Sequence, residues 1–196
     1  MFYDATKNDH GFPFDPFKAI VAPRPIGWVS TRSVDGVANL APYSYFNAFS
    51  QSPHYVAFGS GPVKDSMRNI EATGEFAFNL ATYGLREQMN ASSAHVAGDE
   101  FDLAGLTRAA CRLIAAPRVA ESPACLECRL YQIVPLPDDR GVAENFMIIG
   151  RVVGIHIDDR FIHDGRVDTA AMRPIARLGY SEYATVTEAW RMRRPD

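Results

Sequence analysis

Residues 23–47 read PRPIGWVSTRSVDGVANLAPYSYFN, and this stretch decides the fold. Residues 26–31 are rich in β-branched and aromatic side chains, which favours a strand. Asp35-Gly36 is typical of a hairpin turn, because glycine adopts positive φ without steric cost. Residues 37–41 then form the returning strand. We expect Pro42 to end it, because proline lacks the N–H that a strand ladder needs.

The two ends of this hairpin carry polar side chains that suit a ligand. Residues 30–33 supply three hydroxyls and a guanidinium, and residues 41–47 supply Ser44, Asn47 and three aromatic rings. Such a surface suits a flat polar ring with an anionic tail. Turn capping and core packing explain the same residues without a ligand, so the two interpretations stay open at this point.

A second polar corner, Lys64-Asp65-Ser66, opens a predicted helix over 65–73, which Gly74 ends. The start of a helix has free N–H groups and a positive dipole, both of which suit a phosphate. Lys64 and Ser66 would add a charge and a donor there. A plain helix cap beside a solvated lysine is the alternative.

Strands dominate the remaining chain, with short helices between them, which predicts a mainly β (α+β) fold in one domain over 1–196. Residues 75–81 alternate, with Phe76, Phe78 and Leu80 facing inward. Gly150 and Gly154, in a long strand over 146–157, indicate a bulge or a close approach of another chain segment. The other predicted segments are an N-terminal arm (1–18), a helix (85–94), an acidic loop and candidate lid (98–105), a strand (124–134) and a C-terminal tail (185–196).

Composition excludes several classes of protein. A net charge of −3 with scattered basic residues argues against nucleic-acid binding, and no apolar stretch is long enough for a membrane helix. Three cysteines, an odd number, together with an N-terminus that lacks a signal-peptide core, predict a cytoplasmic protein. Cys125 and Cys128, three apart on one strand, would point to opposite faces, which predicts structural roles. The five histidines lie far apart, and we expect no metal site.

Six stretches of the chain, in order between residues 20 and 184, resemble the flavin reductase-like family: PRPIGWVST, DG, NLAPYSYFNAFS, KDSMRNIEATGEFAFNLA, NFMIIGRVVGIHIDD and PIARLGYSEYA. The resemblance implies an FMN-binding split β-barrel of antiparallel strands with short peripheral helices. It also implies a set of flavin-binding residues in this sequence: Trp28, Val29, Ser30, Thr31, Ala41, Pro42, Tyr43, Ser44, Tyr45, Phe46, Asn47, Lys64, Asp65 and Ser66. Strand alternation puts Tyr43 and Tyr45 on one face and Ser44 and Phe46 on the other, which we favour as the flavin side.

The resemblance implies an NAD(P)H-dependent flavin reductase, in which the flavin carries out the hydride chemistry and no catalytic side chain is obligatory. His163, Tyr180 and residues 99–102 are candidates for the nicotinamide side. The expected partners are a second copy of the chain, in a homodimer, and a flavin-dependent monooxygenase. The alternatives are a flavoprotein that reduces its own organic acceptor with tightly bound FMN, and a non-enzymatic flavin carrier or sensor.

Overall fold

The computed structural model describes residues 1–94 and 98–195, so His95 lies outside the described residues. Residues 1–16 and 186–195 belong to no helix or strand among those that the structure describes. The helices and strands are α1 (Phe17–Ile20), β1 (Arg24–Pro25), β2 (Gly27–Arg32), β3 (Ala38–Tyr43), β4 (Phe46–Gln51), β5 (His54–Ser60), α2 (Asp65–Thr73), β6 (Glu75–Leu80), η1 (Tyr83–Leu85), α3 (Arg86–Ala91), α4 (Glu100–Leu103), β7 (Arg108–Ala109), β8 (Arg118–Val119), β9 (Ala124–Pro137), β10 (Ala143–Ile157), η2 (Asp159–Phe161), β11 (Ile162–His163), β12 (Arg166–Val167), α5 (Thr169–Met172), β13 (Ile175–Arg177) and β14 (Tyr183–Thr185).

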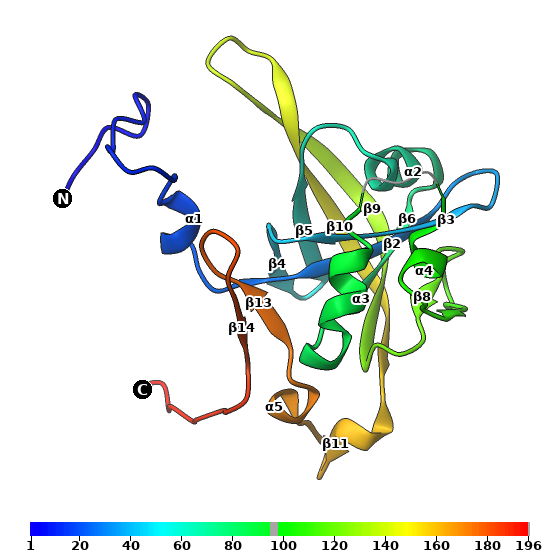
Figure 1. Ribbon diagram of the computed structural model, residues 1–196. Coiled ribbons are helices and arrows are strands. Elements are labelled where there is room, and N and C mark those ends of the chain that lie inside the picture. Colours follow the sequence, from blue (N-terminus) through cyan, green and yellow to red (C-terminus); the bar gives the residue numbers. More distant parts are fainter. Residues whose placement is uncertain (95–97, 196) are drawn as a thin grey trace.

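The main sheet is antiparallel, and among the described residues it has seven strands in the order β3-β2-β6-β9-β10-β5-β4. Its two edge strands, β3 and β4, are consecutive in the chain and only Ser44 and Tyr45 lie between them. The sheet must therefore curl until its edges meet. The Gly59 N–H donates to the Tyr45 carbonyl at 2.8 Å, and the Tyr43 and Phe58 rings lie 4.6 Å apart across this seam. The expected split barrel is confirmed, with α2, α3 and α4 around its outside (Figure 1).

The prediction that Pro42 ends the second strand is wrong. Strand β3 continues to Tyr43, and Pro42 pairs with Trp28 in the ladder. Because β3 is an edge strand, the missing N–H of Pro42 can face away from the sheet at no cost in hydrogen bonds.

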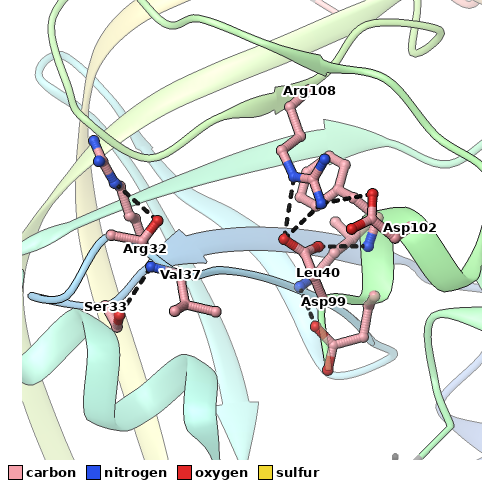
Figure 2. A network of polar contacts seen from close by, with 10 residues as sticks. Arg32, Ser33, Val37, Leu40, Asp99, Asp102 and Arg108 are labelled. Atoms are coloured by element: carbon pink, nitrogen blue, oxygen red, sulfur yellow. Dashed lines mark hydrogen bonds and ion pairs between the residues drawn. The ribbon is translucent and has the colours of Figure 1, made fainter. Parts of the chain in front are cut away.

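Segments outside the sheet cover it in two places. The alternation predicted over residues 75–81 is present, with Phe76 inside the barrel and Ala77 outside it. Ala77 and Asn79 are nevertheless fully buried, because the 110–117 loop lays Ile114 and Ala116 against β6 and β9. The 98–105 segment, expected to be a loop and lid, forms α4, with Phe101 fully buried in a core cluster. A carboxylate oxygen of Glu100 accepts a hydrogen bond from the Leu40 N–H at 3.1 Å, which fastens α4 to β3 (Figure 2).

The prediction for the CxxC pair is confirmed. Cys128 packs inside the barrel, whereas Cys125 packs outside it with Ile114 and Ala116. Both thiols are free. The bulges predicted near Gly150 and Gly154 are also present, as register shifts between β9 and β10.

No helix among the described residues is long and apolar enough to cross a membrane.

Candidate functional site

A cleft of about 1130 Å³ lies at the seam where the sheet closes. The segment before β2, the β3–β4 connection, the end of β5 and the start of β10 form its walls. The residues that line it are Lys18, Ile20, Val21, Ala22, Pro23, Arg24, Pro25, Pro42, Tyr43, Ser44, Tyr45, Phe46, Asn47, Phe49, Ala57, Phe58, Gly59, Ser60, Gly61, Lys64, Leu136, Asn145, Phe146 and Met147. Seven of the sequence-predicted residues, Pro42 to Asn47 and Lys64, thus border one cavity.

The aromatic side chains of this cleft are held by the barrel. The Phe46 ring stacks on Phe78 with centroids 4.4 Å apart and planes 5° from parallel. Strand β2 passes directly beneath it, since a Cβ on Gly27 would lie 2.8 Å from the Phe46 ring. Tyr45 and Phe49 remain exposed. One ring is therefore fixed, and two are available to cover a ligand.

The expectation of alternating faces over residues 43–46 is wrong. The chain bends at Ser44 and Tyr45 to pass from one sheet edge to the other, so these residues do not continue a strand. As a result Tyr43, Ser44, Tyr45 and Phe46 all border the same cleft.

A second, smaller cleft of about 310 Å³ adjoins the first and shares Pro42, Tyr43 and Lys64 with it. It lies at the start of α2, and most of its lining is polar. The lining residues are Asn39, Ala41, Pro42, Tyr43, Val63, Lys64, Asp65, Ser66, Arg68, Ser92, Ser93, Ala94 and Glu100. The predicted KDS corner and the predicted NLAPYSYFN run therefore meet along one continuous groove.

The charges in the second cleft are unevenly paired. Asp65 forms an ion pair with Arg68, so these two charges offset each other. Lys64 occupies the N-cap position of α2 without a side-chain capping bond, and it makes no ion pair with any described residue. Burial raises the pKa of Glu100, in spite of its hydrogen bond to Leu40. Lys64 is thus the cation available to an anion at this helix start.

Two buried hydroxyls border the groove without a hydrogen-bond partner among the described residues, those of Tyr43 and Ser60. Burial raises the pKa of Tyr43, an effect that the neighbouring Ser66 and Ser60 hydroxyls only partly oppose, so Tyr43 stays a neutral donor. Buried polar groups in folded proteins are normally paired. Two orphaned hydroxyls facing one cavity therefore suit a ligand that has polar atoms there.

Trp28, Val29, Ser30 and Thr31 line neither cleft and are fully buried in β2. Their side chains bind neighbouring elements instead. Trp28 Nε1 donates to Ser92 Oγ at 2.9 Å, Ser30 Oγ donates to the Pro117 carbonyl at 2.5 Å, and Thr31 Oγ1 accepts from Asn69 of α2 at 3.0 Å. These residues support the walls of the groove from behind.

Of the residues considered for a nicotinamide side, Glu100 lines the smaller cleft, whereas His163, Tyr180, Asp99 and Asp102 line neither cleft. His163 is exposed in the β11–β12 hairpin, and Tyr180 packs near Phe14 with ring centroids 5.8 Å apart. Asp99 and Asp102 both pair with Arg108, at 2.7 and 2.8 Å, which directs their charges into a local network (Figure 2).

Sequence reasoning missed the wall contributed by β5 and β10. Ser60 pairs with Phe146 in the sheet, and this register brings Gly59, Gly61, Asn145 and Met147 to the cleft. Arg24 is buried and donates to the carbonyls of Lys18, Val21 and Leu178, which fixes the segment before β2. The proline on each side of Arg24 was the available signal for a rigid structural role.

Comparison with known proteins shows the family and the fold of this chain. The family profile described as "Flavin reductase like domain" matches residues 21–171. An uncharacterised protein of Halalkalibacterium halodurans is 34% identical over 182 residues, covering 89% of this chain and 87% of its own. The crystal structure of nitrilotriacetate monooxygenase component B from Bacillus cereus is similar, with a TM-score of 0.90, 27% identity and coverage of 98% of this chain and 99% of that one. A protein with a split barrel domain from Shewanella frigidimarina shares the fold, with a TM-score of 0.86, 21% identity and full coverage of both chains.

Proposed function

Since the chain belongs to the flavin reductase-like domain family, we propose that it binds FMN in the two joined clefts and reduces it with NAD(P)H. The observation that carries this proposal is the junction of the clefts at Pro42, Tyr43 and Lys64. It places a large cavity with aromatic walls beside a small polar one at a helix start. FMN has the same two parts, a flat ring system and a terminal phosphate.

The residues present fit FMN on grounds independent of the family. The small cleft offers the Lys64 ammonium, the Ser66 hydroxyl and the first N–H groups of α2, all suited to a phosphate. The buried hydroxyls of Tyr43 and Ser60 lack partners and suit the polar atoms of the ribityl chain or ring. The larger cleft offers Pro42, Phe46 and Phe49 as apolar cover.

When bound, FMN supplies the redox chemistry, accepting a hydride from the nicotinamide and passing electrons on. The residues of this chain have to bind the flavin, orient it and shield it from water. Lys64 neutralises the phosphate charge, and the Asn39–Ser66 hydrogen bond orients the Ser66 hydroxyl at the helix start. The neutral Tyr43 phenol, unpaired with any described residue in the flavin-free protein, would donate a hydrogen bond to the flavin and exclude water from the junction of the clefts. Tyr45 and Phe49 remain exposed, so a nicotinamide can stack beside the flavin at the mouth.

A homodimer belongs to the same proposal, with the partner subunit completing the cleft. The arm and tail expose large apolar side chains that a second copy would cover, among them Phe2 (92% exposed), Phe14 (67%) and Trp190 (75%). Phe49, at 66% exposed, lies in the cleft lining itself. A dimer that covers this side would enclose the flavin more completely.

A flavin-dependent monooxygenase is the proposed recipient of reduced flavin. The Bacillus cereus neighbour is described as component B of nitrilotriacetate monooxygenase, a protein that works as one part of a larger system. We place the present protein in the cytoplasm, which its three free thiols support.

The test begins with the visible spectrum of the purified protein and the mass of any released cofactor. NADH and NADPH oxidation is then followed with catalytic protein, first with added FMN and next with organic acceptors. Turnover of free FMN supports the reductase. Turnover only with an organic acceptor supports the flavoprotein that reduces its own substrate. FMN binding without either activity supports a carrier or sensor, and failure to bind FMN overturns the proposal.

A further inference from the structure

A second cluster of reactive side chains lies on the outer face of the barrel, apart from both clefts. It consists of Cys111, Glu127 and His156, which come from the 110–117 loop, β9 and β10. The Cys111 Sγ, a Glu127 carboxylate oxygen and a His156 ring nitrogen all lie within 4.8 Å of one another. None of these residues lines the flavin groove.

Glu127 is the centre of the cluster and is 1% exposed. Its Oε1 lies 2.5 Å from His156 Nε2 and accepts from the Arg112 N–H at 2.8 Å, while its Oε2 accepts from the Leu113 N–H at 2.6 Å. Burial opposes the charge, but the Arg112 N–H, His156 and the Leu113 N–H outweigh it and lower the pKa of Glu127. The carboxylate is therefore ionised and rigidly held.

The chemistry of the three groups selects one class of ligand. A thiolate, an imidazole and a carboxylate together suit a borderline-soft divalent ion such as Zn²⁺, and they are a poor set for Mg²⁺ or Ca²⁺. Ligand atoms bound to one tetrahedral Zn²⁺ lie roughly 3 to 4 Å from each other, given bond lengths of about 2.0–2.3 Å. The three ligand atoms of the cluster, all within 4.8 Å of one another, lie near that spacing.

Solvent can reach the cluster, and neighbouring groups hold its ligands in place. The His156 side chain is 21% exposed and Cys111 is half-buried, so an ion can enter from solvent and keep a water as its fourth ligand. The Arg112 and Leu113 N–H groups would remain on the carboxylate as outer-shell donors that hold its orientation. Ile114, Ala116 and Val153 pack around the site as an apolar shell.

We propose that Cys111, Glu127 and His156 bind a Zn²⁺ ion that fastens the 110–117 loop to the barrel. On binding, the Cys111 thiol releases its proton to solvent. The proton that His156 Nε2 shares with Glu127 leaves Nε2, either to solvent or to Nδ1, and this frees the Nε2 lone pair for the ion. A Glu127 oxygen completes the protein ligand set. No electron is transferred. The sequence did not indicate this site, because its members lie far apart in the chain.

The experiment titrates Co²⁺ into chelator-treated full-length protein and follows the absorption spectrum. Binding at the cluster gives a near-ultraviolet thiolate-to-cobalt band and intense visible bands typical of a tetrahedral ion, and added Zn²⁺ removes both. Zn²⁺ should also raise the melting temperature, because it binds only the folded chain. A wild-type protein that shows neither the thiolate band nor the Zn²⁺-induced shift overturns the proposal.

Two variants locate the ion. Cys111→Ser should abolish the thiolate band, and His156→Gln should weaken Zn²⁺ binding at least about tenfold. His163→Gln is the matched control, because His163 is an exposed histidine outside the cluster. The Zn²⁺ affinity of this variant should equal that of wild type. Far-UV circular dichroism checks folding. If Cys111→Ser fails to fold, the His156→Gln and His163→Gln pair decides, and equal Zn²⁺ affinities in that pair contradict the assignment.

Discussion

The side-chain amide of Asn39 donates a hydrogen bond of 2.9 Å to the Ser66 hydroxyl and so joins strand β3 to the first turn of α2. Both residues are buried, and both line the smaller cleft. A parallel bond runs from Asn69 of α2 to Thr31 of β2 at 3.0 Å. The β2–β3 hairpin therefore fixes the position of α2, and with it the place where Lys64 meets the groove.

Lys64→Ala should weaken FMN binding without unfolding the protein. Lys64 is half-buried and has no ion pair with a described residue, so its loss removes a charge that only a ligand uses. A charge-assisted phosphate contact contributes roughly 1.5–3 kcal/mol, which corresponds to about a tenfold to hundredfold rise in Kd. Quenching of FMN fluorescence measures the Kd. Lys7→Ala, which removes an exposed lysine paired with Asp4, is the control and should leave the Kd unchanged.

Tyr43→Phe should have opposite effects on binding and on stability. In the flavin-free protein the buried hydroxyl has no partner, so its removal should leave the free energy of unfolding unchanged or higher. FMN binding should weaken by about 0.5–1.5 kcal/mol, because the phenol no longer donates to the ligand. Urea unfolding and FMN titration of the same samples measure the two effects.

Tyr131→Phe is the matched control, since Tyr131 is exposed and outside both clefts. It should change neither quantity. A loss of more than about 1 kcal/mol of flavin-free stability in Tyr43→Phe would mean that the hydroxyl is already paired within the protein.

Glu127→Gln should destabilise the protein at neutral pH and reduce its loss of stability in acid. The amide cannot accept on both sides, so at least one donor among Arg112, Leu113 and His156 loses its partner, at a cost of roughly 1–3 kcal/mol. The folded-state pKa of Glu127 lies below its unfolded value of about 4.3, so the stabilisation is complete above that pH. It is lost as the pH falls through the folded-state pKa.

The measurement is urea unfolding between neutral pH and pH values below about 4, with a chelator present so that no metal contributes. The difference in free energy of unfolding between wild type and Glu127→Gln should be largest at neutral pH and shrink in acid. Glu71→Gln, an exposed control on α2, should track wild type throughout. A difference that stays constant over this range contradicts a role for the charge.

Local signals in the sequence were sufficient for several elements. Helix α2 begins and ends where the KDS corner and Gly74 predict, because Gly74 adopts φ 73° at the end of the helix. The opposite faces of Cys125 and Cys128 follow from strand geometry alone. The groove could be predicted in part, since Pro42 to Asn47 and Lys64 to Ser66 do line it.

Tertiary contacts decided the rest. The bend at Ser44 and Tyr45 exists because β3 and β4 occupy opposite edges of a curled sheet, which no local pattern reports. The burial of Asn79 depends on β8, where the Val119 N–H donates to the Asn79 side chain at 2.8 Å. Ser60 joins the groove only through its pairing with Phe146 on β10, a strand far along the chain.

Gly150→Ala should destabilise the barrel, because no room exists for its Cβ. A Cβ at this position would lie 2.5 Å from Cε1 of Phe76, a fully buried ring, and 3.3 Å from the Cβ of Cys128. Both neighbours belong to the barrel core and neither can move into solvent. Overpacking of this kind costs roughly 1–3 kcal/mol, measurable as a lower urea midpoint with an unchanged slope.

Gly84→Ala is the matched control, since its Cβ would meet nothing closer than 3.9 Å. The free energy of unfolding of this variant should stay within about 0.5 kcal/mol of the wild-type value. The double variant Gly150→Ala/Phe76→Leu separates the clash from a general intolerance of alanine, because leucine lacks the far edge of the ring. If the ring is the obstacle, the double variant loses less free energy of unfolding than the two single variants lose together. The difference, the coupling energy, should be at least about 0.5 kcal/mol. Strict additivity would show that alanine at 150 is disfavoured by the bulged strand rather than by Phe76.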